Sequence, residues 1–312
     1  MPAPMKWRTK ILLAKIETTY GTDPAPTAAA NAILATEVVL TPMEGSDASR
    51  DLELPYLGAQ ATIPAELQAK LAFKVEMAPS GTAGTVPAWG PLLRACAMAQ
   101  TVSAAVSVTY NPITDTHESV GIYFWIDTTR YVLLGARGNC KLMISAQGIP
   151  YLMFEFTGLF AQPAETARVT PVLTAFQKPQ LATKANTPTF TLNAVAFVLR
   201  ELTLDLGNQI EPRFLIGSEG ILITDKAETI EATVEAQPLT AFNPFALAAA
   251  QTTVPLVMVH GVGAGKITTL NVLNAQMQRP QGLSNAQNIK EWPLRMVPLP
   301  TAGNDQFTLV LT

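Results

Sequence analysis

Charged residues are scarce in this chain. They make up 14% of its 312 residues, against roughly 25% in an average soluble domain. The formal net charge is −3, so the sequence lacks the cationic excess with which proteins hold nucleic acid through its phosphates. A surface with so little charge indicates that other subunits cover much of it.

Cysteine and long apolar runs are equally sparse. The two cysteines, Cys96 and Cys140, form no CxxC pair, which argues against a disulfide framework. The apolar run that begins at Ile11 stops at Lys15, which is too short for the ~7–15 apolar residues of a signal peptide. No stretch approaches the ~20 apolar residues of a membrane span. We therefore expect the chain to be made and folded in the cytoplasm.

The sequence also lacks the groupings that catalysis requires. Its two histidines, His117 and His260, each stand beside an expected strand without further metal ligands or a nucleophile nearby. The segment HGVGAGKITT (260–269) is only superficially like a phosphate-binding loop, because Ile267 follows Lys266 where that loop needs Ser or Thr. We expect no catalytic residue, no metal site, no cofactor and no enzymatic activity.

Alternation of apolar and polar residues dominates the chain and is typical of strands with one buried face. It is clearest in residues 69–77 and 229–236. Two segments favour short helices, 89–100 and 243–251, each with a proline near its first turn. The pattern predicts a mainly β protein with β-sandwich domains. The polar positions of the two clearest strands, which are candidates for a functional face, are Lys70, Lys74, Glu76, Glu231 and Glu235.

An internal repeat divides the chain. EVVLTP (37–42) resembles AFVLRE (196–201), and LAFKVEMAP (71–79) resembles IEATVEAQP (230–238). Both pairs share one offset, since 196 − 37 = 159 and 230 − 71 = 159. The Pro-, Ala- and Thr-rich segment 161–190 is typical of a linker. We expect two tandem domains, 1–160 and 191–312, each with one short flanking helix.

The first repeat contains a long segment between its first two strands, residues 43–66. A loop of this length inside a compact domain is uncommon unless it is functional. It mixes apolar with charged residues, which a solvated insertion would not need. We expect an arm that packs on a neighbouring subunit. Its candidate contact residues are Glu44, Asp47, Arg50, Asp51, Glu53, Leu54 and Tyr56.

The opening LAKIETTYGTDPAPTAAANAIL (13–34), followed by EVVLTP and this arm, resembles the tail tube (major tail) proteins of long-tailed bacteriophages. The resemblance implies a β-sandwich with a flanking helix, assembled into stacked rings whose lumen conducts double-stranded DNA without binding it specifically. It implies a place in the virion tail, beside the tape measure, terminator and baseplate proteins. Family members usually form rings of six domains, with about four lumen-lining strands per domain.

Strand geometry then sets the number of chains per ring. About 24 strands, spaced ~4.8 Å apart and tilted ~40°, give a circumference of about 150 Å and a diameter near 48 Å. Three two-domain chains supply six domains, so we expect trimeric rings with pseudo-sixfold symmetry. The polar positions of 69–77 and 229–236 are candidates for the lumen or for contacts between rings.

Two other functions remain open at this point. One is a baseplate or tail-terminator ring of the same fold, which differs from a tube subunit in its lower abundance. The other is a carbohydrate-binding or adhesive β-sandwich. Such a protein would gather exposed aromatic residues, whereas the tryptophans here are dispersed at positions 7, 89, 125 and 292.

Overall fold

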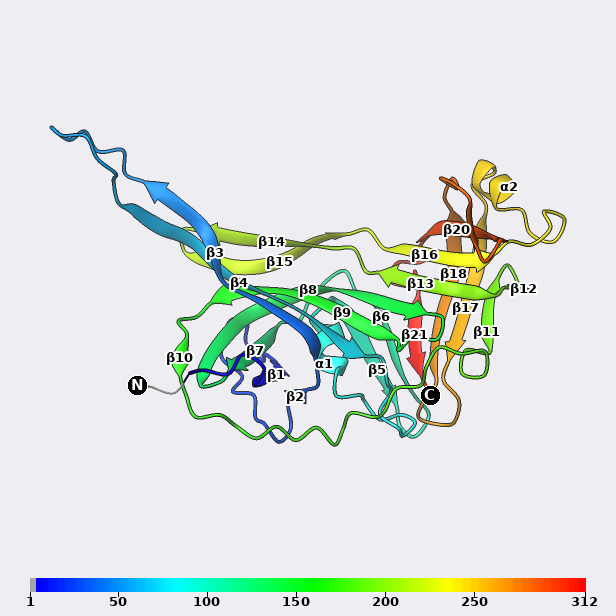
Figure 1. Ribbon diagram of the computed structural model, residues 1–312, viewed down its shortest axis with the longest axis horizontal. Helices are drawn as coiled ribbons and strands as arrows, with labels where there is room; N and C mark the ends of the chain where they lie inside the picture. Colours follow the sequence, from blue (N-terminus) through cyan, green and yellow to red (C-terminus); the bar gives the residue numbers. More distant parts are fainter. Residues whose placement is uncertain (1–3) are drawn as a thin grey trace.

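The computed structural model describes residues 4–312 and is mainly β, with 51% strand, 4% helix and open sheets (Figure 1). The predicted β-sandwich class is confirmed. The two helices of the described residues are short, and each begins with a proline in its first turn, as expected. In the second helix the Asn243 side chain caps the N-terminus by accepting the N–H of Ala246.

The first half of the chain forms two facing layers that share one long strand. One layer has the strand order β3–β4–β9–β8, and the other has β2–β1–β7 paired with the beginning of β8. The elements are β1 (Lys10–Ile16), β2 (Ala32–Ile33), β3 (Thr36–Ser49), β4 (Thr62–Glu76), α1 (Gly90–Arg94), β5 (Met98–Ser103), β6 (Ser107–Pro112), β7 (Val120–Ile126), β8 (Thr129–Ser145) and β9 (Tyr151–Phe160).

The second half repeats this pairing scheme. Its layers have the orders β13–β16–β20–β18 and β12–β11–β17–β18–β21. β10 (Ala164–Glu165) precedes this half and pairs with β8 of the first half. The elements of the second half are β11 (Thr189–Leu192), β12 (Val195–Ala196), β13 (Leu199–Asp205), β14 (Asn208–Leu215), β15 (Ser218–Lys226), β16 (Thr229–Glu235), α2 (Pro244–Ala249), β17 (Thr253–His260), β18 (Thr268–Met277), β19 (Ser284–Ala286), β20 (Ile289–Pro298) and β21 (Thr308–Leu311).

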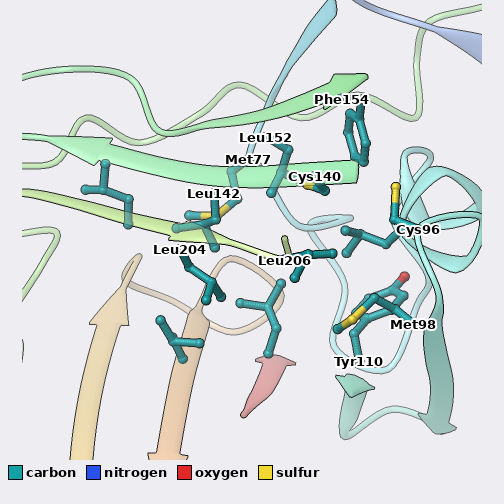
Figure 2. Packing of buried hydrophobic residues seen from close by; sticks show 14 of the residues in the cluster. Met77, Cys96, Met98, Tyr110, Cys140, Leu142, Leu152, Phe154, Leu204 and Leu206 are labelled. Carbon is teal, nitrogen blue, oxygen red and sulfur yellow. The ribbon is translucent and has the colours of Figure 1, made fainter. Parts of the chain in front are cut away.

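The two halves are joined edge to edge. The end of β8 pairs with β13, and β21 pairs with β6, so 19 strands belong to one hydrogen-bonded network. One hydrophobic cluster runs through both halves. Leu142 of β8 lies opposite Leu204 of β13, and both side chains are buried in this cluster (Figure 2). The halves therefore fold against one another.

The registers correct one part of the predicted repeat. Val75 and Val234 occupy matching places on β4 and β16, which keeps the offset at 234 − 75 = 159. On the preceding strands, Leu40 lies opposite Leu71, whereas Leu204 lies opposite Ile230. Leu40 therefore matches Leu204 at an offset of 204 − 40 = 164. The predicted alignment of 37–42 with 196–201 is wrong by five residues, because the first arm is longer.

The predicted linker lies along the first half. Between β10 and β11 it has no regular strands or helices. The Val172 N–H donates to the Ala28 carbonyl at 2.9 Å. Val169 and Leu173 pack on the smaller apolar cluster that contains Tyr123. This segment thus covers the outer layer of the first half.

We expect Leu204→Ala to lower the free energy of unfolding by about 2–5 kcal/mol, because it leaves a cavity where the two halves meet. Chemical denaturation followed by fluorescence and circular dichroism measures the change. Val39→Ala is the matched control, since Val39 is 64% exposed and its truncation should change stability by less than about 0.5 kcal/mol. Equal losses for the two variants would contradict the shared core.

Candidate assembly surfaces and polar face

Both halves contribute to one continuous polar face. We use this name for the side of the sheet β3–β4–β9–β8–β13–β16–β20 that points away from the core. Side chains opposite one another in an antiparallel pair lie on the same side of a sheet, so the registers connect positions across all the strands. One row crosses six strands through Glu76, Tyr151, Met143, Thr203, Glu231 and Arg295.

The structure brings the predicted polar positions onto this single face. Lys70, Lys74 and Glu76 alternate with buried residues on β4. Glu231 and Glu235 do the same on β16. The sequence did not show that the two sets share one sheet, because that follows from the pairing of β8 with β13.

Opposite charges alternate along the polar face. The Lys70 ammonium lies 2.5 Å from the Glu44 carboxylate, and that of Lys74 lies 2.6 Å from Glu37. Further along, Lys141 lies 3.0 Å from Asp205, and Arg295 lies 3.7 Å from Glu231. Exposed ion pairs of this kind contribute little to stability. They do place positive and negative charges side by side, so the face has no large region of one sign.

Asp205 lies where the halves meet. Its carboxylate accepts hydrogen bonds from the Asn139 side chain at 2.7 Å and the Gly207 N–H at 2.9 Å, and it pairs with Lys141. Burial by itself would raise the pKa of this carboxyl, but the hydrogen bonds and the Lys141 ammonium outweigh it and hold the pKa below its usual value.

The lowered pKa of Asp205 makes its contribution depend on pH. A carboxyl with a lowered pKa stabilises the fold above its unfolded pKa of about 3.9, and that stabilisation is lost as the pH falls through the folded value. We expect Asp205→Asn to lower the free energy of unfolding at pH 7 by on the order of 1 kcal/mol, since partial exposure screens the charge. The gap between wild type and variant, measured by urea denaturation from pH 7 to pH 3, should shrink below pH ~4. A gap independent of pH would contradict this role.

The first arm is a β-ribbon, not the long loop that the sequence predicted. β3 continues to Ser49 and β4 begins at Thr62. The ribbon extends away from the body of the molecule (Figure 1). Of the predicted contact residues, Glu44 and Asp47 lie on β3, and the tip between the two strands carries Arg50, Asp51, Glu53, Leu54 and Tyr56.

The tip of the first arm is ordered by its own hydrogen bonds. The Gln60 side chain accepts the Leu52 N–H at 2.7 Å and donates to the Leu52 carbonyl at 2.6 Å. The Ser49 hydroxyl donates to Asp51. Tyr56 is 68% exposed, and Leu52 and Leu54 are also exposed. The tip is thus held by local hydrogen bonds, while its apolar side chains remain exposed in the single chain.

The second arm, β14–β15, lies back on the first half of its own chain (Figure 1). The Arg137 guanidinium donates to the Ile221 carbonyl at 2.8 Å and stacks 4.9 Å from the centre of the Tyr20 ring. The Tyr20 hydroxyl accepts the Ile221 N–H at 2.5 Å. Sequence analysis missed these anchors. Tyr20 belongs to the opening segment 13–34, but its partner Ile221 is far away in the sequence.

The other groups considered from sequence have structural partners. A ring nitrogen of His117 contacts the Ile113 carbonyl at 3.3 Å, and one of His260 contacts the Thr187 hydroxyl at 3.0 Å. Residues 261–267 form the turn between antiparallel β17 and β18, with no helix to hold a phosphate. Cys96 is buried in the core (Figure 2). Across residues 4–312 there is no cluster of three potential metal ligands. No helix of the described chain is long and apolar enough to cross a membrane.

Comparison with known proteins decides the family. The model of the phage tail tube protein family matches residues 7–303. The chain belongs to that family. The recognition made from residues 13–34 and the arm is therefore confirmed. No curated protein matches the chain.

Membership makes this tail tube protein a structural component of the virion tail. Its partners are other copies of itself and other tail proteins. The match extends over both halves and both arms, so the long exposed ribbon and the polar face belong to the family region.

Proposed function

We propose that three copies of this tail tube protein form each ring of the tube, so that six domains surround the lumen with pseudo-sixfold symmetry. One observation carries the proposal: β13 extends the sheet of the first half at β8. A single chain is thus already an arc of two similar units, the predicted domains 1–160 and 191–312, joined through the segment 161–190. The ring closes when the same joint forms between chains.

The polar face lines the lumen in this proposal, including Lys70, Lys74, Glu76, Glu231 and Glu235. A basic lining would retain DNA by releasing its counterions. Here four cations of the polar face each lie beside a carboxylate: Lys70, Lys74, Lys141 and Arg295. A duplex moving along the lumen therefore meets no uniform attraction. The tube acts as a passive conduit for the genome, without cofactor or catalysis, and it is assembled in the host cytoplasm with the tape measure, terminator and baseplate proteins.

The stoichiometry is directly measurable. We expect electron microscopy of assembled tubes to show three chains per ring, with a sixfold pattern at low resolution that becomes threefold when the halves are distinguished. Native mass spectrometry of isolated rings should give three times the mass of a single chain. Six chains per ring would contradict the proposal.

The contribution of the apolar tip of the first arm to assembly can be measured by substitution. We expect the combined substitution Leu52→Ser, Leu54→Ser and Tyr56→Ser to lower tube yield at least tenfold while the chain stays folded, because the exposed tip contributes to assembly and not to the core. Sedimentation measures assembly, and circular dichroism measures folding.

The matched control changes exposed apolar residues away from the arm, Val172→Ser and Leu239→Ser. These side chains are 47% and 51% exposed, and the control should form tubes at the wild-type yield. Normal tubes from the arm variant would show that the arm has no part in assembly.

A further inference from the structure

The root of the second arm shows how an arm is held. Its Asn208 side chain donates to the carbonyl of Cys96, just beyond α1, at 2.9 Å and to that of Gly138 on β8 at 3.0 Å. On the other strand of the arm, the Lys226 ammonium donates to the Ala97 carbonyl at 2.9 Å. The second arm is thus fixed at the junction of a helix end and a long strand of the first half.

The registers identify the counterpart of this junction in the second half. Trp292 of β20 matches Leu152 of β9, because their partners are Val234 and Val75. Leu142 of β8 lies opposite Leu152. Beyond β18, Ser284 lies opposite Glu291, which places position 283 opposite 292. Within β18, Met277 lies opposite Met296 as Gly138 lies opposite Phe156, and positions 296 and 156 are each four residues beyond Trp292 and Leu152. Residues 137–140 therefore correspond to 276–279.

An open groove of about 390 Å³ lies at this counterpart position. It is lined by Gln251, Gln276, Met277, Gln278, Arg279 and Gln281. Gln251 follows α2 with a left-handed backbone (φ 54°), as Ala97 follows α1 (φ 56°). The groove thus combines the same helix end and the same strand, but the first arm of its own chain points elsewhere (Figure 1).

We propose that the root of the first arm of a neighbouring copy occupies this glutamine-lined groove, an inference that rests on the proposed ring. The root comprises Pro42–Glu44 and Gln68. At the corrected offset, 208 − 44 = 164, Glu44 is the counterpart of Asn208, and it lies opposite Gln68 as Asn208 lies opposite Lys226. The joint between chains then copies the joint within the chain.

The chemistry of the two surfaces is complementary. Arg279 is exposed and takes part in no ion pair among residues 4–312. Within the described chain Glu44 forms an ion pair only with Lys70, and the site is partly exposed, so a second cation is accommodated there at little cost in free energy. The side-chain oxygen of Gln68 is buried without a hydrogen-bond partner, which fits a root whose polar groups are satisfied on assembly.

The sheet edges agree with this placement. Among the described residues β3 pairs only with β4, so its outer edge is open. The matching edge of β13 binds β8, with the Leu206 N–H donating to the Cys140 carbonyl at 3.0 Å. In the second half the Gln278 N–H donates to the carbonyl of Arg295 on β20. Because successive backbone groups of a strand point in opposite directions, the N–H of Arg279 then points away from β20, where an added strand can accept it.

A charge exchange tests the proposal. We expect Glu44→Arg and Arg279→Glu each to lower tube yield at least tenfold, and the double variant to restore most of it, because the exchanged charges meet again across the joint. The matched control combines Glu44→Arg with Arg295→Glu, which removes a nearby cation that is already paired with Glu231. That combination should give no rescue.

A crosslink gives a second readout if the double variant fails to fold or assemble. Leu283→Cys combined with Val38→Cys or Leu40→Cys should yield disulfide-linked chains in oxidised tubes, since paired strands bring Cα atoms within disulfide reach. Cys96 and Cys140 are buried and stay out of the reaction. Leu283→Cys with Val198→Cys is the control and should give no linked chains.

The outcomes separate this inference from the proposed function. Wild-type chains that form no rings or tubes would overturn the proposed function. Wild-type tubes combined with normal assembly of both single charge variants, or with no linked chains from either cysteine pair, would overturn the groove contact and leave the ring intact. Rescue by the double variant or linkage at position 283 supports it.

Discussion

The pairing of β8 with β13 is the contact on which the rest of the structure depends. Five consecutive residue pairs, from Glu201 opposite Ser145 to Asp205 opposite Lys141, align two edges that would otherwise be exposed. Unpaired edges invite association with other chains, and here the chain satisfies one such edge with its own second half. The same contact buries Leu142 against Leu204 and turns two polar surfaces into one.

Edge pairing within the chain also explains the different fates of the two arms. The second arm finds its docking surface on the first half, where Tyr20 and Arg137 hold its backbone at Ile221. The first arm has the same place in its own repeat, but among the described residues its outer part lies on no other unit. It therefore remains extended with its apolar tip exposed (Figure 1). The difference arises from position in the chain, not from a different kind of arm.

Sequence alone was most reliable for strands in which buried and exposed residues alternate. The strands at 69–77 and 229–236 are confirmed as β4 and β16, because one face of each meets the core and the other meets solvent. β1 was missed because its residues 11–14 are buried on both faces, under the core on one side and the segment 161–190 on the other. The distal part of β3 was predicted as a loop because it is exposed on both faces.

The polar face and the joint were beyond prediction from sequence for a related reason. Alternation reports which residues face away from the core, but not which strands become neighbours. Lys74 and Glu231 fall on one surface only through β9, β8 and β13, which separate them in the sheet. The repeat was visible, yet its first strand was misaligned by five residues because the exposed arm tolerates a length difference at little thermodynamic cost.

Duplication has a further consequence for assembly. An association between separate molecules loses translational and rotational freedom, which opposes each intermolecular joint. When two units are covalently linked, the second joint forms at a high effective concentration. A ring of about six units built from duplicated chains, as strand geometry favours, needs about three intermolecular joints instead of about six. The joint between β8 and β13 lies within one chain, so folding alone sets its register. In the ring that we propose, each chain enters with half of the joints between units already made, and the exposed arm and the open edge of β3 are left for the other half.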